Sequence, residues 1–196
     1  WIDELEKGGM TARTIEINCA YLRSLIKISM KSGLLHDIQV NPFSLVDFST
    51  EEVRHIPTML ETDYIGLGQM LPDLPKVQRV AMLTQAFTGT RYSEIKRRGA
   101  VDFDLKAGTF TIEHDPGKGK GVKNKHSRRT IPLPEALIKE LDGFDFNWPS
   151  MAVVNKKLKM VNPELSSHSF RHGLIRLNRD LGGDADVLEA YVGHSL

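Results

Sequence analysis

Apolar residues recur at three- and four-residue spacing in several stretches of the chain, and this period predicts a mainly helical protein. The longest predicted helix covers residues 11–32, where Thr11 or Thr14 can cap the start and Gly33 can end the helix. Further helices are predicted over residues 76–88, 91–97, 134–141, 151–160, 165–180 and 184–191, and from Ser49 or Thr50 to about Leu60. Residues 61–75 contain two glycines and two prolines, so we predict a loop there.

In the middle of the chain the period changes to an alternation of polar and apolar residues, which is typical of β-strands. Strands are predicted over residues 101–105, 109–113 and 129–133. A short turn joins the first two, and a long loop, residues 114–128, joins the second to the third. The predicted fold class is therefore α+β: a mainly helical domain with a small antiparallel three-stranded sheet.

Composition narrows the class of protein. The 196 residues are 40% hydrophobic, which supports a packed core. The formal net charge is +1, so total charge predicts no partner. The one cysteine, Cys19, excludes a disulfide framework and fits a reducing compartment. No apolar run is long enough to span a bilayer and nothing resembles a signal peptide, so we predict a cytoplasmic protein without membrane contact.

Positive charge is concentrated in the loop between the second and third strands. Between Pro116 and Pro134 there are six cationic residues and no acidic one. They are Lys118, Lys120, Lys123, Lys125, Arg128 and Arg129. Charge of one sign on a glycine-rich hairpin tip suits the phosphate backbone of a nucleic acid. A solvated loop is the alternative. The glycines do not form a P-loop, because a strand follows them where that motif needs a helix.

A second candidate group begins directly after a predicted helix break at Gly89. Arg91 opens the next helix, and Glu94 follows three residues later. At this spacing the Glu94 carboxylate can hold the guanidinium or cap the helix. An ordinary salt bridge at a helix start explains the pair equally well when it is considered alone.

A third group lies near the start of the helix predicted over residues 165–180, where Ser166 or Ser167 can be the N-cap. His168 and Arg171 are three residues apart and so lie side by side on a helix. Backbone N–H groups at a helix start favour an anion, and a histidine beside a permanent cation suits a phosphate. The alternative is a surface helix with a mixed polar face.

Taken together and in order, these motifs resemble the tyrosine recombinases of the phage-integrase type. That family has a Thr-Gly-x-Arg-x-x-Glu box, a lysine on a β-hairpin, a His-x-x-Arg box, a Gly-His-Ser histidine and then a nucleophilic tyrosine. The corresponding segments here are 88–94, the basic hairpin before Ile131-Pro132-Leu133, 168–171 and 193–195. The resemblance covers about residues 49–196. Each box alone is weak, whereas all four in this order are specific.

The resemblance implies roles for individual residues. Arg91 and Arg171 would be the catalytic arginines, and His168 and His194 the catalytic histidines. Glu94 would orient Arg91.

The hairpin lysine is assigned by counting back from Ile131, and Lys123 best matches the family position. Lys118 and Lys125 stay candidates because hairpin length varies. The remaining hairpin cations are predicted to contact DNA: Lys118, Lys120, Lys125, Arg128 and Arg129.

The family tyrosine follows the Gly-His-Ser box by several residues, so we expect it after Leu196. Tyr21, Tyr64, Tyr92 and Tyr191 match no nucleophile box.

The resemblance also implies two parts of the chain. Residues 1–45 would be the C-terminal part of a helical core-binding domain with its linker. Residues 46–196 would be the catalytic domain without its tyrosine segment. The implied partner is double-stranded DNA, bound by a homotetramer that forms from monomers.

The implied reaction is site-specific recombination or integration by breaking and rejoining DNA. A tyrosine attacks a DNA phosphate, a 3′-phosphotyrosyl link forms, and a 5′ hydroxyl reverses it without ATP, cofactor or metal. The sequence contains no cluster of carboxylates of the kind that forms a two-metal nuclease site. His168 and His172 have the four-residue spacing of a zinc site, but the glutamate of the His-Glu-x-x-His motif is absent. This fragment alone is expected to be inactive. The alternatives are a type IB topoisomerase-like enzyme and a non-catalytic DNA-binding protein on the same scaffold.

Overall fold

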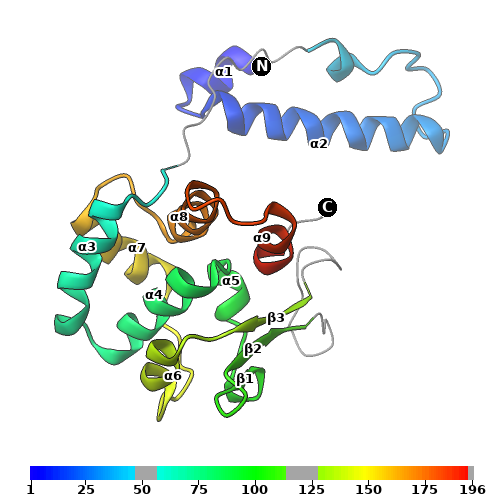
Figure 1. The fold of residues 1–196 in the computed structure, drawn as a ribbon. Helices are drawn as coiled ribbons and strands as arrows, with labels where there is room; N and C mark the ends of the chain where they lie inside the picture. Colours follow the sequence, from blue (N-terminus) through cyan, green and yellow to red (C-terminus); the bar gives the residue numbers. More distant parts are fainter. Residues whose placement is uncertain (47–56, 114–127, 194–196) are drawn as a thin grey trace. The chain divides into compact units, whose positions relative to one another are not determined.

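The computed structural model describes residues 1–46, 57–113 and 128–193 (Figure 1). The chain divides into two compact units, Trp1–His55 and Ile56–Leu196. The first unit contains the helices α1 (Ile2–Lys7) and α2 (Ala12–Lys31) and a 3-10 helix at Pro42–Leu45. Thr11 caps α2, because its hydroxyl oxygen accepts the backbone N–H of Thr14 at 3.3 Å. The assignment of this unit to a core-binding domain stays a prediction.

The second unit combines helices with one small sheet (Figure 1). Its elements are α3 (Glu61–Met70), a 3-10 helix (Leu71–Asp73), α4 (Lys76–Thr88), α5 (Tyr92–Ile95), a 3-10 helix (Ala100–Asp102), β1 (Phe103–Asp104), β2 (Thr109–Ile112), β3 (Arg129–Pro132), α6 (Glu135–Leu141), α7 (Met151–Val161), α8 (Ser167–Asp180) and α9 (Ala185–Val192). The strands are antiparallel in the order β1-β2-β3. The α+β class with a small three-stranded sheet is therefore confirmed.

The core of this unit forms around α4, which packs against α6, α7 and α8. Val80 and Met82 of α4 are completely buried. The sheet contributes alternate side chains, since successive residues of a strand point to opposite faces. Phe110 stacks on Phe103 with 4.2 Å between ring centroids, and Ile131 lies opposite Phe110 in the register. Burial of these apolar side chains stabilises the positions of the C-terminal end of α4 and of the start of β3, where the candidate site lies.

The loop predicted over residues 61–75 is wrong, because α3 occupies Glu61–Met70. Asp63 caps this helix by accepting the backbone N–H of Leu60 at 2.9 Å. Gly66 lets α3 approach α7 closely, since a Cβ there would lie 3.0 Å from Val161 Cγ1. Tertiary packing thus overrides the low helix propensity of glycine.

Two other predicted boundaries also change. Residues 57–60 are not helical, and the rest of the helix predicted to end at Leu60 lies outside the described residues. The first strand is shorter than predicted, because Ala100–Asp102 form a 3-10 helix.

Candidate functional site

The start of α8 is held by hydrogen bonds to itself and to α7. Ser166 is the N-cap, and its backbone N–H donates to the Ser169 hydroxyl at 3.1 Å. The backbone N–H of Ser167 donates to Asn155 Oδ1 of α7 at 2.8 Å. These contacts orient the first turn, so that Arg171 is buried while His168 stays exposed.

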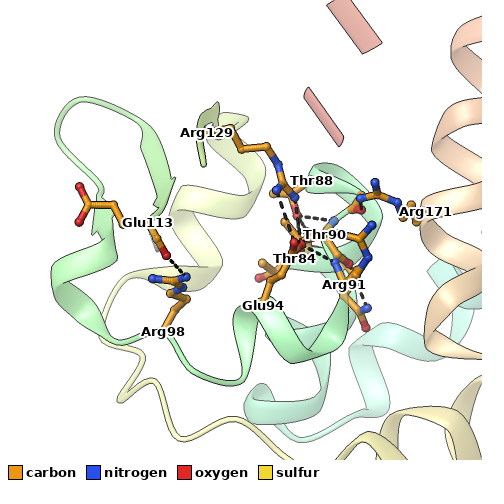
Figure 2. A network of polar contacts seen from close by, with 11 residues as sticks. Thr84, Thr88, Thr90, Arg91, Glu94, Arg98, Glu113, Arg129 and Arg171 are labelled. Carbon is orange, nitrogen blue, oxygen red and sulfur yellow. Dashed lines mark hydrogen bonds and ion pairs between the residues drawn. The ribbon is translucent and has the colours of Figure 1, made fainter. Parts of the chain in front are cut away.

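Arg171 reaches from α8 toward the segment that joins α4 to α5 (Figure 2). Its Nη1 donates to the carbonyl oxygen of Gly89 at 3.1 Å, and the side chain is almost fully buried. Among the described residues its Nη2 has no hydrogen-bond partner. Burial, and then the charge of Arg91, lower the pKa of Arg171 to about 10, so it remains a cation at neutral pH. A buried guanidinium with an unused donor favours binding of an anion.

Arg91 is the N-cap of α5 and is held by Glu94 in two ways. Its backbone N–H donates to Glu94 Oε2 at 2.9 Å, and its Nη1 pairs with Glu94 Oε1 at 3.1 Å. Glu94 therefore makes both contacts that the three-residue spacing allows. The Arg91 side chain keeps 24% exposure, so part of its guanidinium stays accessible.

The buried side chain of Gln85 ties the Arg91 segment to α8. Its Nε2 lies 3.4 Å from the carbonyl oxygen of Thr90 and 3.2 Å from that of Ser167. Thr88 Oγ1 adds a hydrogen bond to Thr90 Oγ1 at 2.8 Å. The two arginine-bearing segments are therefore joined by a fixed polar framework, of which Figure 2 shows Thr88 and Thr90. Sequence reasoning missed Gln85; a polar residue on the apolar face of a helix was the available signal.

Arg129 has a different setting from the one predicted. Its Nη2 pairs with Glu94 Oε2 at 2.9 Å, and each of these side chains is only 6% exposed (Figure 2). Arg129 shares the inward face of β3 with Ile131, whereas Arg128 is exposed. The inward position could have been found from the two-residue period. The predicted DNA contact of Arg129 stays a prediction. In the structure its side chain forms a buried ion pair with Glu94.

The charges of the site also act on its titratable groups. Burial would raise the pKa of Glu94, but the hydrogen bond and charge of Arg129, with those of Arg91, outweigh burial and hold that pKa below its usual value. Burial lowers the pKa of His168, and the charges of His172 and the two arginines Arg171 and Arg91 add to that effect. His168 is therefore a neutral imidazole at neutral pH.

The remaining predicted site residues, Lys118, Lys120, Lys123, Lys125 and His194, lie outside the described residues. Tyr191 is half-buried on α9, and its hydroxyl donates to the carbonyl oxygen of Phe87 at 2.9 Å. Over the described ranges, no three or more His, Cys, Asp or Glu side chains gather in a way that could hold a metal ion. In that same part of the chain, no helix combines the length and the apolar character needed to cross a membrane.

Replacing Glu94 with glutamine is expected to lower the free energy of unfolding by about 3 kcal/mol at neutral pH, because the buried Arg129 and the partly exposed Arg91 both lose their counter-charge. The folded pKa of Glu94 lies below its unfolded value. Its stabilisation is therefore complete above the unfolded pKa and is lost as the pH falls through the folded pKa. Urea unfolding of the wild type and of Glu94→Gln should show that the difference in their free energies of unfolding becomes smaller as the pH falls into the acidic range.

The matched control is Glu140→Gln, which removes the partner of Arg79 from a more exposed ion pair. This variant should lose about 1 kcal/mol or less. A Glu94→Gln deficit that stays constant down to strongly acidic pH would contradict the role given to the Glu94 charge.

Comparison with known proteins identifies the fold. A scan against protein-family models and a search of curated proteins found no match. Among solved structures, the Tn1549 transposon integrase in complex with a circular intermediate DNA has a TM-score of 0.74 at 19% identity, over 100% of this chain and 76% of that one. A lambda integrase tetramer bound to a Holliday junction gives 0.73 at 16% identity, over 100% and 62%. XerA recombinase gives 0.58 at 16% identity, over 95% and 75%.

The chain therefore has the fold of tyrosine recombinases, as its motifs predict. At these identities the likeness concerns the fold.

Proposed function

We propose that the second unit binds a DNA phosphate and is the catalytic domain of a site-specific tyrosine recombinase or integrase. The observation that carries the proposal is Arg171, a buried cation whose Nη2 has no hydrogen-bond partner among the described residues. It lies beside Arg91 within a recombinase fold. Arg128 and the hairpin lysines would contact the DNA backbone, since DNA is present in the integrase structures that share this fold.

The residues present suit transfer of a phosphodiester. When a tyrosine oxygen attacks phosphorus, the P–O3′ bond is kept, the P–O5′ bond breaks, and negative charge grows on the non-bridging oxygens. Arg91 and Arg171 would bind those oxygens, because guanidiniums offer paired donors and keep their charge. His168 and His194 would donate hydrogen bonds or move protons, and Lys123 would protonate the departing 5′ oxygen.

The assignments made by resemblance complete the proposal. The nucleophilic tyrosine would follow Ser195, and no metal or cofactor would take part. Residues 1–45 would belong to a core-binding domain, and the protein would act in the cytoplasm as a tetramer on double-stranded DNA, as lambda integrase is seen on a Holliday junction.

Sulfate, a phosphate-shaped dianion, tests the anion pocket in the 196-residue chain itself. Because a bound anion favours a protonated imidazole, sulfate should raise the pKa of His168. By linkage, the affinity for sulfate should increase as the pH falls from about 8 to about 5.5. The measurement is an NMR titration of the His168 ring with and without sulfate.

The exposed His36 of the first unit provides an internal control in the same spectra. Arg171→Gln should abolish the effect of sulfate on His168. An equal response of His36 and His168 to saturating sulfate would refute a specific pocket.

A further inference from the structure

Arg129 lies where three parts of the site meet. Its side chain comes from β3, the strand that leads out of the basic hairpin, and it pairs with Glu94 at the start of α5 (Figure 2). It also lies against the end of α9, because a Cβ added to Gly193 would be 2.5 Å from Arg129 Nη1. Residue 194 follows directly. One buried side chain therefore contacts both Glu94, which holds Arg91, and the residue before His194.

We propose that Arg129 is a positioning residue of the phosphate site: acting through Glu94 it fixes the Arg91 guanidinium, and through Gly193 it holds the end of α9. This inference rests on the proposed function for its catalytic meaning. The structural part of the inference, that Arg129 fixes the position of Arg91, can be tested independently of the proposed function.

The contacts of Glu94 show how the control would work. Arg129 Nη2 and the Arg91 backbone N–H both lie 2.9 Å from Glu94 Oε2, while Arg91 Nη1 lies 3.1 Å from Oε1. The carboxylate is thus held from both sides, and its two oxygens cannot rotate without breaking a charged hydrogen bond. Arg91 alone is a poor anchor, since its own side chain is 24% exposed and its stem is flexible. Arg129, which is 6% exposed, supplies the rigid side.

Gly193 explains why the third contact is close. It has φ of +71°, a left-handed conformation that ends α9 and that glycine adopts without strain. The absence of a side chain lets the backbone lie directly on the guanidinium. Since α9 also packs on β3, a shift of Arg129 would disturb the end of this helix. A DNA contact would instead require an accessible guanidinium.

The first test measures Arg91 directly, in the 196-residue chain. Arg129→Gln should lower the NMR order parameter of the Arg91 Nε–H bond, because Glu94 then loses its rigid partner. The matched control is Arg79→Gln, which breaks the Arg79–Glu140 ion pair of the same unit and should leave the order of Arg91 unchanged. If Arg129→Gln does not fold, Arg129→Lys, which keeps the charge but loses the paired geometry, should give a smaller decrease.

The second test uses the full gene product under single-turnover conditions with saturating DNA. Arg129→Gln should cleave about 10²-fold more slowly, the effect expected of a small misplacement of a catalytic group. Affinity for DNA should change about twofold or less, as expected of a residue that does not touch the phosphates. The acid limb of the rate profile should move to higher pH. Among the described residues, Arg129 and Arg91 are the charged groups that lower the pKa of Glu94, so loss of Arg129 raises that pKa. The Glu94 charge in turn raises the pKa values of His168 and Arg171.

The outcomes separate the two claims. An unchanged order parameter for Arg91 in both Arg129 variants overturns the inference. So does a variant that loses DNA affinity yet cleaves at the wild-type rate when saturated, because Arg129 would then be a DNA contact. A wild-type protein that does not cleave overturns the proposed function instead, and the Arg91 measurement still decides whether Arg129 positions it.

Discussion

Replacing Arg171 with glutamine is expected to slow strand cleavage by the full gene product about 10²- to 10³-fold, the cost of losing one preorganised donor to a developing oxyanion. Arg171 is buried and its Nη1 is fixed by Gly89, so its second nitrogen can meet a phosphate without further reorganisation. Glutamine is polar but carries no charge and cannot bind two oxygens at once. Single-turnover cleavage of a nicked DNA substrate measures the loss.

Two further variants identify the cause of that loss. Arg171→Lys keeps the positive charge without the planar donor pair and should still be impaired about 10-fold or more. Arg176→Gln removes an exposed arginine from the same helix, where it pairs with Asp180 at 3.3 Å, and should cleave normally. Cleavage by Arg171→Gln within a factor of about two of wild type would exclude Arg171 from the reaction.

Gly89→Ala is expected to lower the free energy of unfolding by about 2 kcal/mol. Gly89 ends α4 with φ of +59°, a left-handed conformation that costs other residues about 1–2 kcal/mol. An added Cβ would also lie 2.7 Å from Leu174 Cδ2, so the Leu174 side chain of α8 would have to move. Because the Gly89 carbonyl oxygen accepts from Arg171, sulfate binding should weaken as well. Urea unfolding and the His168 titration measure the two effects.

Gly68→Ala is the matched control for that substitution. Gly68 lies within α3, and an added Cβ would meet nothing within 4 Å. Alanine should therefore stabilise the helix by about 0.5–1 kcal/mol. If both substitutions shifted stability in the same direction, the explanation from backbone conformation would fail.

The helices could be predicted from sequence where one apolar face decides the structure. Residues 76–88 form α4 with the bounds that the apolar period predicts. Prediction failed for α3, because its two glycines indicate a loop and the packing of Gly66 against Val161 is not visible in the sequence. The capping residue Asp63 was the local signal for that helix, since an acidic residue in the first turn is typical of a helix start.

The order of the motifs implied that Arg91 and Arg171 share a site, but the contacts within the site were predictable only between residues that are near in sequence. The contact of Arg91 with Glu94 follows from their spacing of three residues. The contact of Arg129 with Glu94 joins residues 35 positions apart, and it depends on the strand register that pairs Ile112 with Arg129. The excess of positive charge around Arg129 predicts a nucleic-acid contact, which stays a prediction, but it gave no sign that this side chain lies on the inward face of β3 and pairs with Glu94. Charge counting does not distinguish the two faces of a strand.

The most direct measurement of the central claim is covalent capture of DNA by the full gene product. The protein is incubated in EDTA with a suicide substrate whose nick lets the cleaved fragment diffuse away, and the products are separated on a denaturing gel. We expect a covalent protein–DNA band that disappears when the first tyrosine encoded after Ser195 is changed to phenylalanine. Tight binding of the cognate DNA without any such band would contradict the account and would identify a DNA-binding protein on a recombinase scaffold.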